Sequence, residues 1–74
     1  MGGRHRESVR ILLNDQPAET TATDLLALMR EHGLSEEAGV AAAVDGAVVP
    51  RGRWAETRLA EGAQILVIRA AQGG

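Results

Sequence analysis

The first apolar residues of the chain recur at every second position. Residues 9, 11 and 13 are aliphatic, a period that places their side chains on one face of a strand. Residues 14–17 form a cluster of turn-forming types. The pattern therefore predicts a strand that begins at Ser8, followed by a hairpin that returns through a short second strand to Thr20.

The spacing of apolar residues then changes to that of a helix. Three residues share one helical face at i, i+3 and i+4: Leu25, Leu28 and Met29. Thr21 and Asp24 have the spacing of a capping box, and Thr23 is the rival N-cap. Gly33 is placed for a left-handed stop, which predicts that the helix ends at about His32.

Two further strands and a tight turn are predicted next. Residues 40–44 are apolar and rich in alanine, which leaves room for a bulky side chain to pack close. Asp45-Gly46 is a strong two-residue hairpin signal. The return strand through residues 48–49 ends at Pro50, because proline cannot donate to a strand ladder.

The last quarter of the chain predicts an irregular segment followed by one strand. We expect residues 51–63 to be irregular, with Trp54 and Leu59 as anchors and a turn at Glu61-Gly62. Residues 65–68 predict a final strand. The resulting order, two strands, one helix and three strands, predicts an α+β protein with a mixed sheet of about five strands and one main helix across it. This is the β-grasp arrangement.

Length and composition narrow the possible functions. At 74 residues the chain holds one domain, and without cysteine it has no disulfide, thiolate nucleophile or thiolate metal site. His5 and His32 have no neighbours at metal-ligand spacing, so we expect no metal site. A net charge of −2 disfavours binding to nucleic acid, and no apolar run is long enough to span a membrane. We expect a soluble cytoplasmic protein.

The motifs of self-sufficient enzymes are absent from the sequence. There is no P-loop, GxGxxG, HExxH or notable Ser/His/Asp order, and the adjacent Glu36-Glu37 is typical of a solvated loop. We therefore expect a chain that is not itself an enzyme. We divide it into a flexible leader at residues 1–7, a domain at 8–70 and a flexible tail at 71–74.

The tail carries the strongest chemical signal. Gly73-Gly74 ends the chain, and a terminal glycine pair arises by chance in roughly one chain in two hundred. A free carboxylate is a poor electrophile and must first be activated, most simply as an acyl-adenylate formed with ATP. Two residues without Cβ can enter a narrow active site and adopt φ values that other residues avoid. The alternative is a flexible end without a role.

A set of these residues resembles the ThiS-type sulfur carriers of thiamin biosynthesis. The resemblance runs from Val9 to Gly74, and its most specific parts are Val49-Pro50-Arg51 with Trp54 three residues later, and the diglycine end. The other matching residues are Leu13-Asn14, Leu25-Leu26, residues 40–46, Val48, Leu59, Glu61-Gly62 and residues 65–69. The chain departs from the usual pattern at Asp45, where asparagine is common, and at Ala63, where aspartate is common.

The resemblance implies a mechanism and a set of partners. An adenylating enzyme related to ubiquitin-activating proteins (ThiF or MoeB type) would use ATP to activate the Gly74 carboxylate. A cysteine desulfurase or sulfurtransferase would then supply sulfur, and the resulting thiocarboxylate would serve a thiazole synthase. Gly73 and Gly74 would be the reacting end. The expected partner-binding residues are Arg69, Ala71 and Gln72, together with exposed members of the last strand, Leu66 or Ile68.

Several alternatives stay open. Related carriers, including the MoaD type, deliver sulfur to molybdopterin, cysteine or secondary metabolites. A ubiquitin-like modifier would share the adenylation step but join Gly74 to amines, and a binding module would carry the diglycine incidentally. Trp54 is expected to pack across the edge of the sheet, with a partner hot spot as the alternative. Arg69 is expected either to meet acidic groups on the activating enzyme or to be a solvated strand end.

Overall fold

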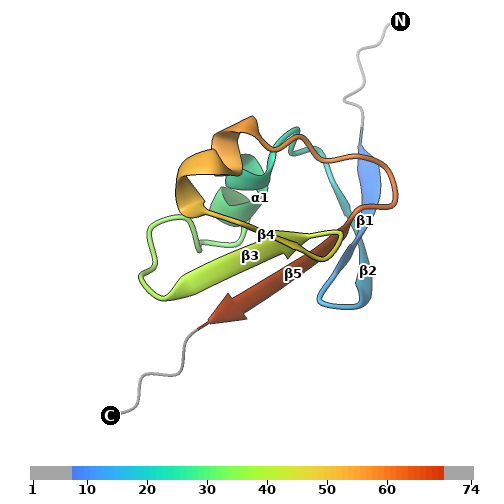
Figure 1. The fold of residues 1–74 in the computed structure, drawn as a ribbon. Helices are drawn as coiled ribbons and strands as arrows, with labels where there is room; N and C mark the ends of the chain where they lie inside the picture. The colour runs from blue at the N-terminus through green and yellow to red at the C-terminus, as the bar shows by residue number, and fades with distance from the viewer. Residues whose placement is uncertain (1–7, 70–74) are drawn as a thin grey trace, which may run out of the picture.

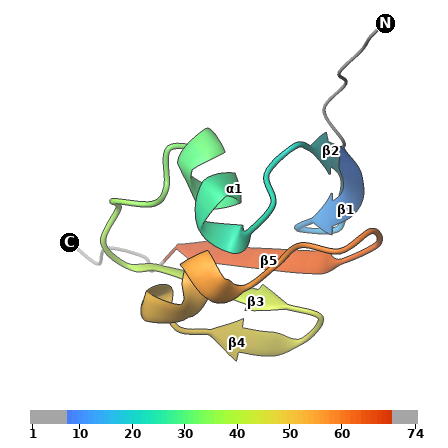
Figure 2. The ribbon, with the colours of Figure 1, turned by 90° about the horizontal axis from the view of Figure 1, so that it is seen from above.

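The computed structural model describes residues 8–69, which form one mixed sheet with a helix across one face (Figures 1 and 2). In chain order the elements are β1 (Val9–Leu13), β2 (Gln16–Thr20), α1 (Leu25–Glu31), β3 (Val40–Val44), β4 (Ala47–Val49), the 3-10 helix η1 (Arg51–Glu56) and β5 (Gln64–Arg69). The strand order across the sheet is β2-β1-β5-β3-β4. Strands β1 and β5 are parallel, and the other neighbours are antiparallel. The β-grasp fold predicted from the sequence is confirmed.

The structure describes residues 8–69 of the predicted domain at residues 8–70, and the division of the chain stays a prediction. The predicted leader and the predicted tail lie outside the described residues. Every predicted strand is present. β1 begins one residue later than predicted, β4 begins one residue earlier, and β5 is longer than expected by one residue at each end.

Helix α1 ends as predicted but begins later. His32 is the C-cap, and Gly33 follows it with a φ of 71°. The amide of Gly33 donates to the carbonyl of Arg30 and that of Leu34 to the carbonyl of Met29, which is a Schellman motif. This motif satisfies carbonyls that the end of the helix would otherwise leave unpaired.

The predicted N-caps, Thr21 and Thr23, are both wrong. Asp24 is the N-cap, and its Oδ1 accepts a hydrogen bond from the amide of Ala27 at 2.8 Å. The preceding backbone is held in an extended form by a distant segment, since the amide of Leu59 donates to the carbonyl of Thr23. An isolated bridge between Asp24 and Arg58 continues this pairing. The helix therefore cannot begin before residue 25.

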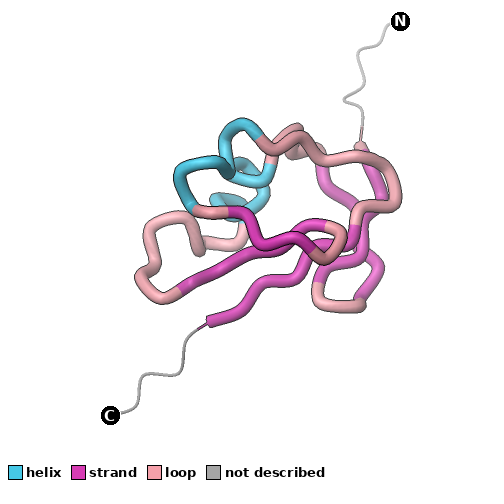
Figure 3. Tube along the Cα trace, in the orientation of Figure 1, coloured by secondary structure: helices cyan, strands magenta, loops and turns pink. Residues whose placement is uncertain are grey.

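The prediction of an irregular segment at 51–63 is also wrong in its first half. Residues 51–56 form η1, which starts after Pro50 and lies beside α1 on the same side of the sheet (Figure 3). The short helix turns Trp54 inward, where its side chain is completely buried. The Trp54 Nε1 donates to the carbonyl of Val49 at 2.9 Å. The sole aromatic residue is thus a core residue beneath the edge strand β4, and the hot-spot alternative is wrong.

The core lies between α1, η1 and one face of the sheet. Its largest fully buried side chains are Trp54, Leu25, Leu28, Met29 and Ile65. Ala42, at the centre of β3, belongs to the same buried cluster, so the alanine-rich strand does make room for bulky neighbours. Ala63 is also buried there, with 5% of its surface exposed.

Candidate functional site

The strand that leads to the chain's end is the central strand of the sheet. Strand β5 pairs with β1 on one side and β3 on the other. Beyond the end of β1 the pairing is continued by a side chain, because Asn14 Oδ1 accepts a hydrogen bond from the amide of Val67 at 2.7 Å. Arg69, the last described residue, still pairs with Val40. The tail is therefore joined to the most fully supported strand of the protein.

The two faces of β5 have different environments, which answers a question that the sequence left open. Ile65 has 2% of its surface exposed and faces α1, and Val67 on the same face is half-buried. Leu66 and Ile68 lie on the other face and are 46% and 51% exposed. The two residues predicted as candidates for docking are thus the ones that the fold leaves accessible.

Leu66 and Ile68 are part of a larger apolar surface on the face of the sheet opposite α1. We call it the open-face patch, and it consists of Leu12, Ala43, Val48, Leu66 and Ile68, which line one shallow hollow. Leu66 lies opposite Ala43 in the sheet, and Ala43 lies opposite Val48. Val48 is 74% exposed. Apolar side chains that adjoin one another in this way are typical of a surface that a partner covers.

Arg69 is engaged by its own chain, which neither interpretation of this residue anticipated. Its guanidinium lies 3.1 Å from Glu37 Oε1, in the loop that precedes β3. The prediction that Glu37 is simply solvated is wrong for the same reason. The Arg69 and Glu37 side chains are 62% and 41% exposed, so the pair contributes at most about 1 kcal/mol. A partner can therefore displace Glu37 from Arg69 at small cost.

The Val-Pro-Arg-x-x-Trp segment has a structural role that the sequence alone did not reveal. The Arg51 guanidinium lies 4.8 Å from the centroid of the Trp54 ring and donates to the carbonyls of Ser35 and Glu37. Arg51 thereby ties the loop before β3 to η1. Since the same loop supplies the carboxylate of Glu37 to Arg69, the motif supports the strand end from a distance. The sequence signal for the contact between Arg51 and Trp54 was their spacing of three residues.

The remaining predicted site residues, Ala71, Gln72, Gly73 and Gly74, lie outside the described residues. Within residues 8–69, no three His, Asp or Glu side chains are grouped so that they could hold a metal ion. No helix in that part of the chain is long and apolar enough to cross a membrane.

Comparison with known proteins identifies the family. The sequence profile described as "ThiS family" matches residues 3–74, nearly the whole chain. The chain belongs to the ThiS family. The resemblance inferred from the Val-Pro-Arg-x-x-Trp segment and the diglycine end is therefore confirmed.

Two individual ThiS proteins are similar to this family member. The sulfur carrier protein ThiS of Escherichia coli (strain K12) is 33% identical over 66 residues, which cover 89% of this chain and all of the relative. The crystal structure of the thiamine biosynthesis protein ThiS of Geobacter metallireducens superimposes with a TM-score of 0.75. It is 16% identical and covers 89% of this chain and all of that chain, a likeness that concerns the fold.

Proposed function

We propose that this ThiS-family chain is a sulfur carrier for thiazole formation in thiamin biosynthesis, with the carboxylate of Gly74 as its reacting group. The observation that carries the proposal is the central strand β5, which exposes Leu66 and Ile68 and leads into a tail ending in Gly73-Gly74. The E. coli relative is itself a sulfur carrier protein. The chain has no cysteine, so the terminus is the group available to hold sulfur.

The proposed chemistry takes place in two steps on a partner enzyme. A carboxylate oxygen of Gly74 attacks the α-phosphate of ATP, forming an acyl-adenylate and releasing pyrophosphate. A sulfide then adds to the acyl carbon and AMP leaves, which gives a C-terminal thiocarboxylate. If the sulfur comes from a persulfide, the first product is an acyl disulfide, and a thiol must cleave its S–S bond. The chain is thus a co-substrate of other enzymes in the cytoplasm, where ATP is available.

The open-face patch is the proposed docking surface for the activating enzyme. Burying Leu66 and Ile68 against a partner removes apolar surface from water, at about 25 cal/mol per Å². Arg69, Ala71 and Gln72 would be contacted on the way to the active site. The glycines would enter it, since residues without Cβ need the narrowest passage.

The test is the intact mass of the protein after incubation with ATP, sulfide and the activating enzyme of its own host. We expect a species heavier by the exchange of one oxygen for one sulfur, mapped to the peptide that ends in Gly74. A variant without Gly73 and Gly74 is the control and should keep its mass. A wild-type protein that keeps its free carboxylate would refute sulfur carriage, and Gly74 in isopeptide linkage would indicate a protein modifier.

The choice of pathway needs a second measurement. The thiocarboxylate form is offered to the thiazole synthase of the host, and the release of the free carboxylate form is followed by mass. Consumption of the thiocarboxylate together with thiazole formation supports the thiamin assignment. If the synthase leaves the thiocarboxylate intact, the carrier serves another acceptor, such as a molybdopterin precursor or a cysteine precursor.

A further inference from the structure

The turn between β1 and β2 holds an aspartate where glycine is the usual choice. Asn14 and Asp15 have φ values of 51° and 67°, and Leu13 pairs with Gln16 across them. Two consecutive positive φ values in a two-residue hairpin are typical of a type I′ turn, whose second residue is most often glycine. The hairpin between β3 and β4 follows this rule, since Asp45 is followed there by Gly46 with a φ of 87°.

The Asp15 carboxylate makes no polar contact with the rest of residues 8–69. The side chains of two other turn residues form hydrogen bonds with the backbone. Asn14 Oδ1 accepts from the amide of Val67, and Asp45 Oδ1 accepts from the amide of Gln64. Asp15 is exposed, and within residues 8–69 its side chain forms no hydrogen bond or ion pair. Backbone conformation alone would favour glycine here, and among residues 8–69 the carboxylate is free to make a contact with a partner.

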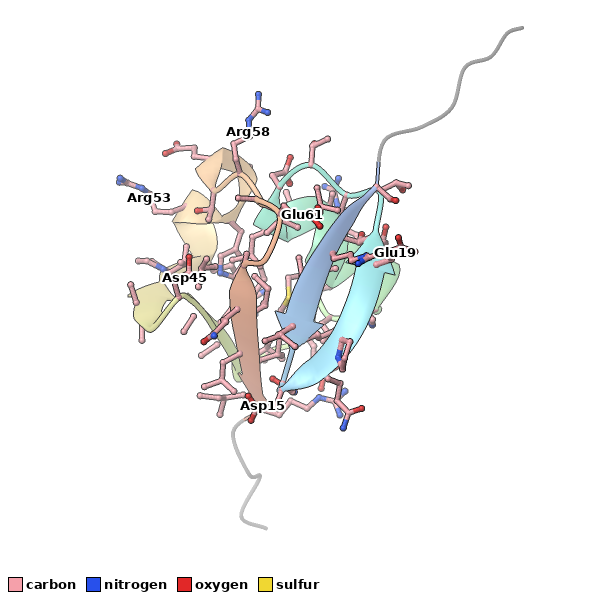
Figure 4. The ribbon with its side chains drawn as sticks, turned by 90° about the vertical axis from the view of Figure 1, so that its right-hand side faces the viewer. Asp15, Glu19, Asp45, Arg53, Arg58 and Glu61 are labelled. Atoms are coloured by element: carbon pink, nitrogen blue, oxygen red, sulfur yellow. The ribbon has the colours of Figure 1, made fainter. Side chains whose placement is uncertain are left out.

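The position of Asp15 on the surface points to that explanation. Asp15 lines the same hollow as Leu12, Leu66 and Ile68, and among the residues of 8–69 that line it, Asp15 alone is charged. In Figure 4 Asp15 lies on the β1–β2 turn at the lower side of the molecule, whereas Arg53 and Arg58 lie at its upper side. The carboxylate therefore stands at the rim of the open-face patch, and no arginine of residues 8–69 forms an ion pair with it.

The short tail brings the activating enzyme close to the hollow that Asp15 borders. Five residues follow Arg69, and fully extended they reach at most about 17 Å. An enzyme that takes Gly74 into a confined active site must therefore approach the end of β5 closely. Ile68 lies near that end and lines the same hollow as Asp15, so an enzyme surface that covers the hollow meets apolar side chains with one negative charge on their border.

We propose that Asp15 is a specificity contact for the activating enzyme, which presents an arginine or lysine to this carboxylate next to an apolar surface that covers the open-face patch. This inference rests on the proposed function. An enzyme with an acidic group at that place would be rejected, because like charges brought together at an interface are unfavourable. A complementary charge at the rim of an interface acts mainly on the association rate and weakens with salt.

The test compares Asp15→Asn and Asp15→Gly with wild type in the rate of thiocarboxylate formation by the host's activating enzyme. Asparagine and glycine both tolerate a positive φ, so the melting temperature of each variant should stay within about 4 °C of wild type. We expect kcat/KM to fall about fivefold at low ionic strength, and the deficit to shrink toward twofold at about 0.5 M NaCl. Glu56→Gln, which removes the same charge from η1, should react like wild type.

The outcomes separate this inference from the proposed function. If wild type forms the thiocarboxylate and both Asp15 variants match it, or if Glu56→Gln is equally impaired, the specificity contact is refuted. It is also refuted if the variants lose only their transfer to the sulfur acceptor, because the contact would then belong to another partner. If wild type itself is not activated, the proposed function fails and the Asp15 assignment falls with it.

Discussion

The two faces of β5 predict opposite phenotypes for two isoleucines that are three positions apart. Ile65 is 2% exposed in the core, whereas Ile68 is 51% exposed on the open-face patch. Ile65→Ala removes buried methyl groups and leaves a cavity, which costs about 2–5 kcal/mol. Ile68→Ala removes atoms of which half already contact water, so its cost is about 1 kcal/mol or less.

These free energies translate into clearly different melting temperatures. For a domain of this size, 1 kcal/mol shifts Tm by about 4–8 °C. Ile65→Ala should therefore lower Tm by about 10 °C or more, and since the total stability is on the order of 5 kcal/mol it can approach complete unfolding. Ile68→Ala should lower Tm by no more than about 8 °C. Thermal denaturation followed by circular dichroism at 222 nm measures both.

Ile65→Ala should lose more Tm than Ile68→Ala, but Ile68→Ala should be the more impaired of the two in KM for the activating enzyme. Ile68→Ala should raise KM for the activating enzyme about tenfold, because a central apolar contact in a small interface contributes on the order of 1–2 kcal/mol. Ile65→Ala, assayed at a temperature at which it is folded, should have the KM of wild type. Equal loss of Tm in both variants would refute the assignment of the faces, and an unchanged KM for Ile68→Ala would refute the docking surface.

Three further predictions concern the framework that supports the tail. Asn14→Ala should lower the free energy of unfolding, measured by urea denaturation, by about 1–3 kcal/mol, because it removes the hydrogen bond to Val67 and places alanine at positive φ. Asn14→Gly should lose only the hydrogen bond. Gly46→Ala should lower the free energy of unfolding by about 1–2 kcal/mol, because Gly46 has a φ of 87°. Gly52 has open space around it, so Gly52→Ala should leave stability unchanged or raise it slightly. Trp54→Phe should cost about 1–3 kcal/mol through the lost Nε1 bond and volume; a cost near zero would contradict the burial of this ring.

Much of the fold was accessible from the sequence because its signals are local. The period-2 strands, the Asp45-Gly46 hairpin and the Gly33 stop each depend on the conformation of two to six adjacent residues. The N-cap was mispredicted because a distant segment decides it: Leu59 pairs with the backbone of Thr23 and holds it extended. Tertiary pairing of this kind leaves no trace in the local pattern.

The candidate site was accessible in part for the same reason. The glycine pair Gly73-Gly74 is visible in the sequence itself, but the accessible face of β5 depends on which face of the sheet α1 covers. Alternation indicates two faces and does not distinguish them when both are apolar, as they are from Ile65 to Ile68. The ion pair between Arg69 and Glu37 joins residues 32 positions apart, so it too required the fold.

The two most specific parts of the family resemblance, the Val-Pro-Arg-x-x-Trp segment and the diglycine end, have separate roles in the molecule. Arg51 and Trp54 hold η1, the loop before β3 and the edge of the sheet together, and none of these contacts involves the tail. A ThiS-like sequence that kept this motif without a terminal glycine pair should therefore fold in the same way and carry no sulfur. Conversely, losing the Arg51 contacts should lower stability while leaving the chemistry of Gly74 intact in the molecules that stay folded. The fold thus depends on the scaffold that Arg51 and Trp54 hold together, whereas the proposed function depends on β5 and the residues after it.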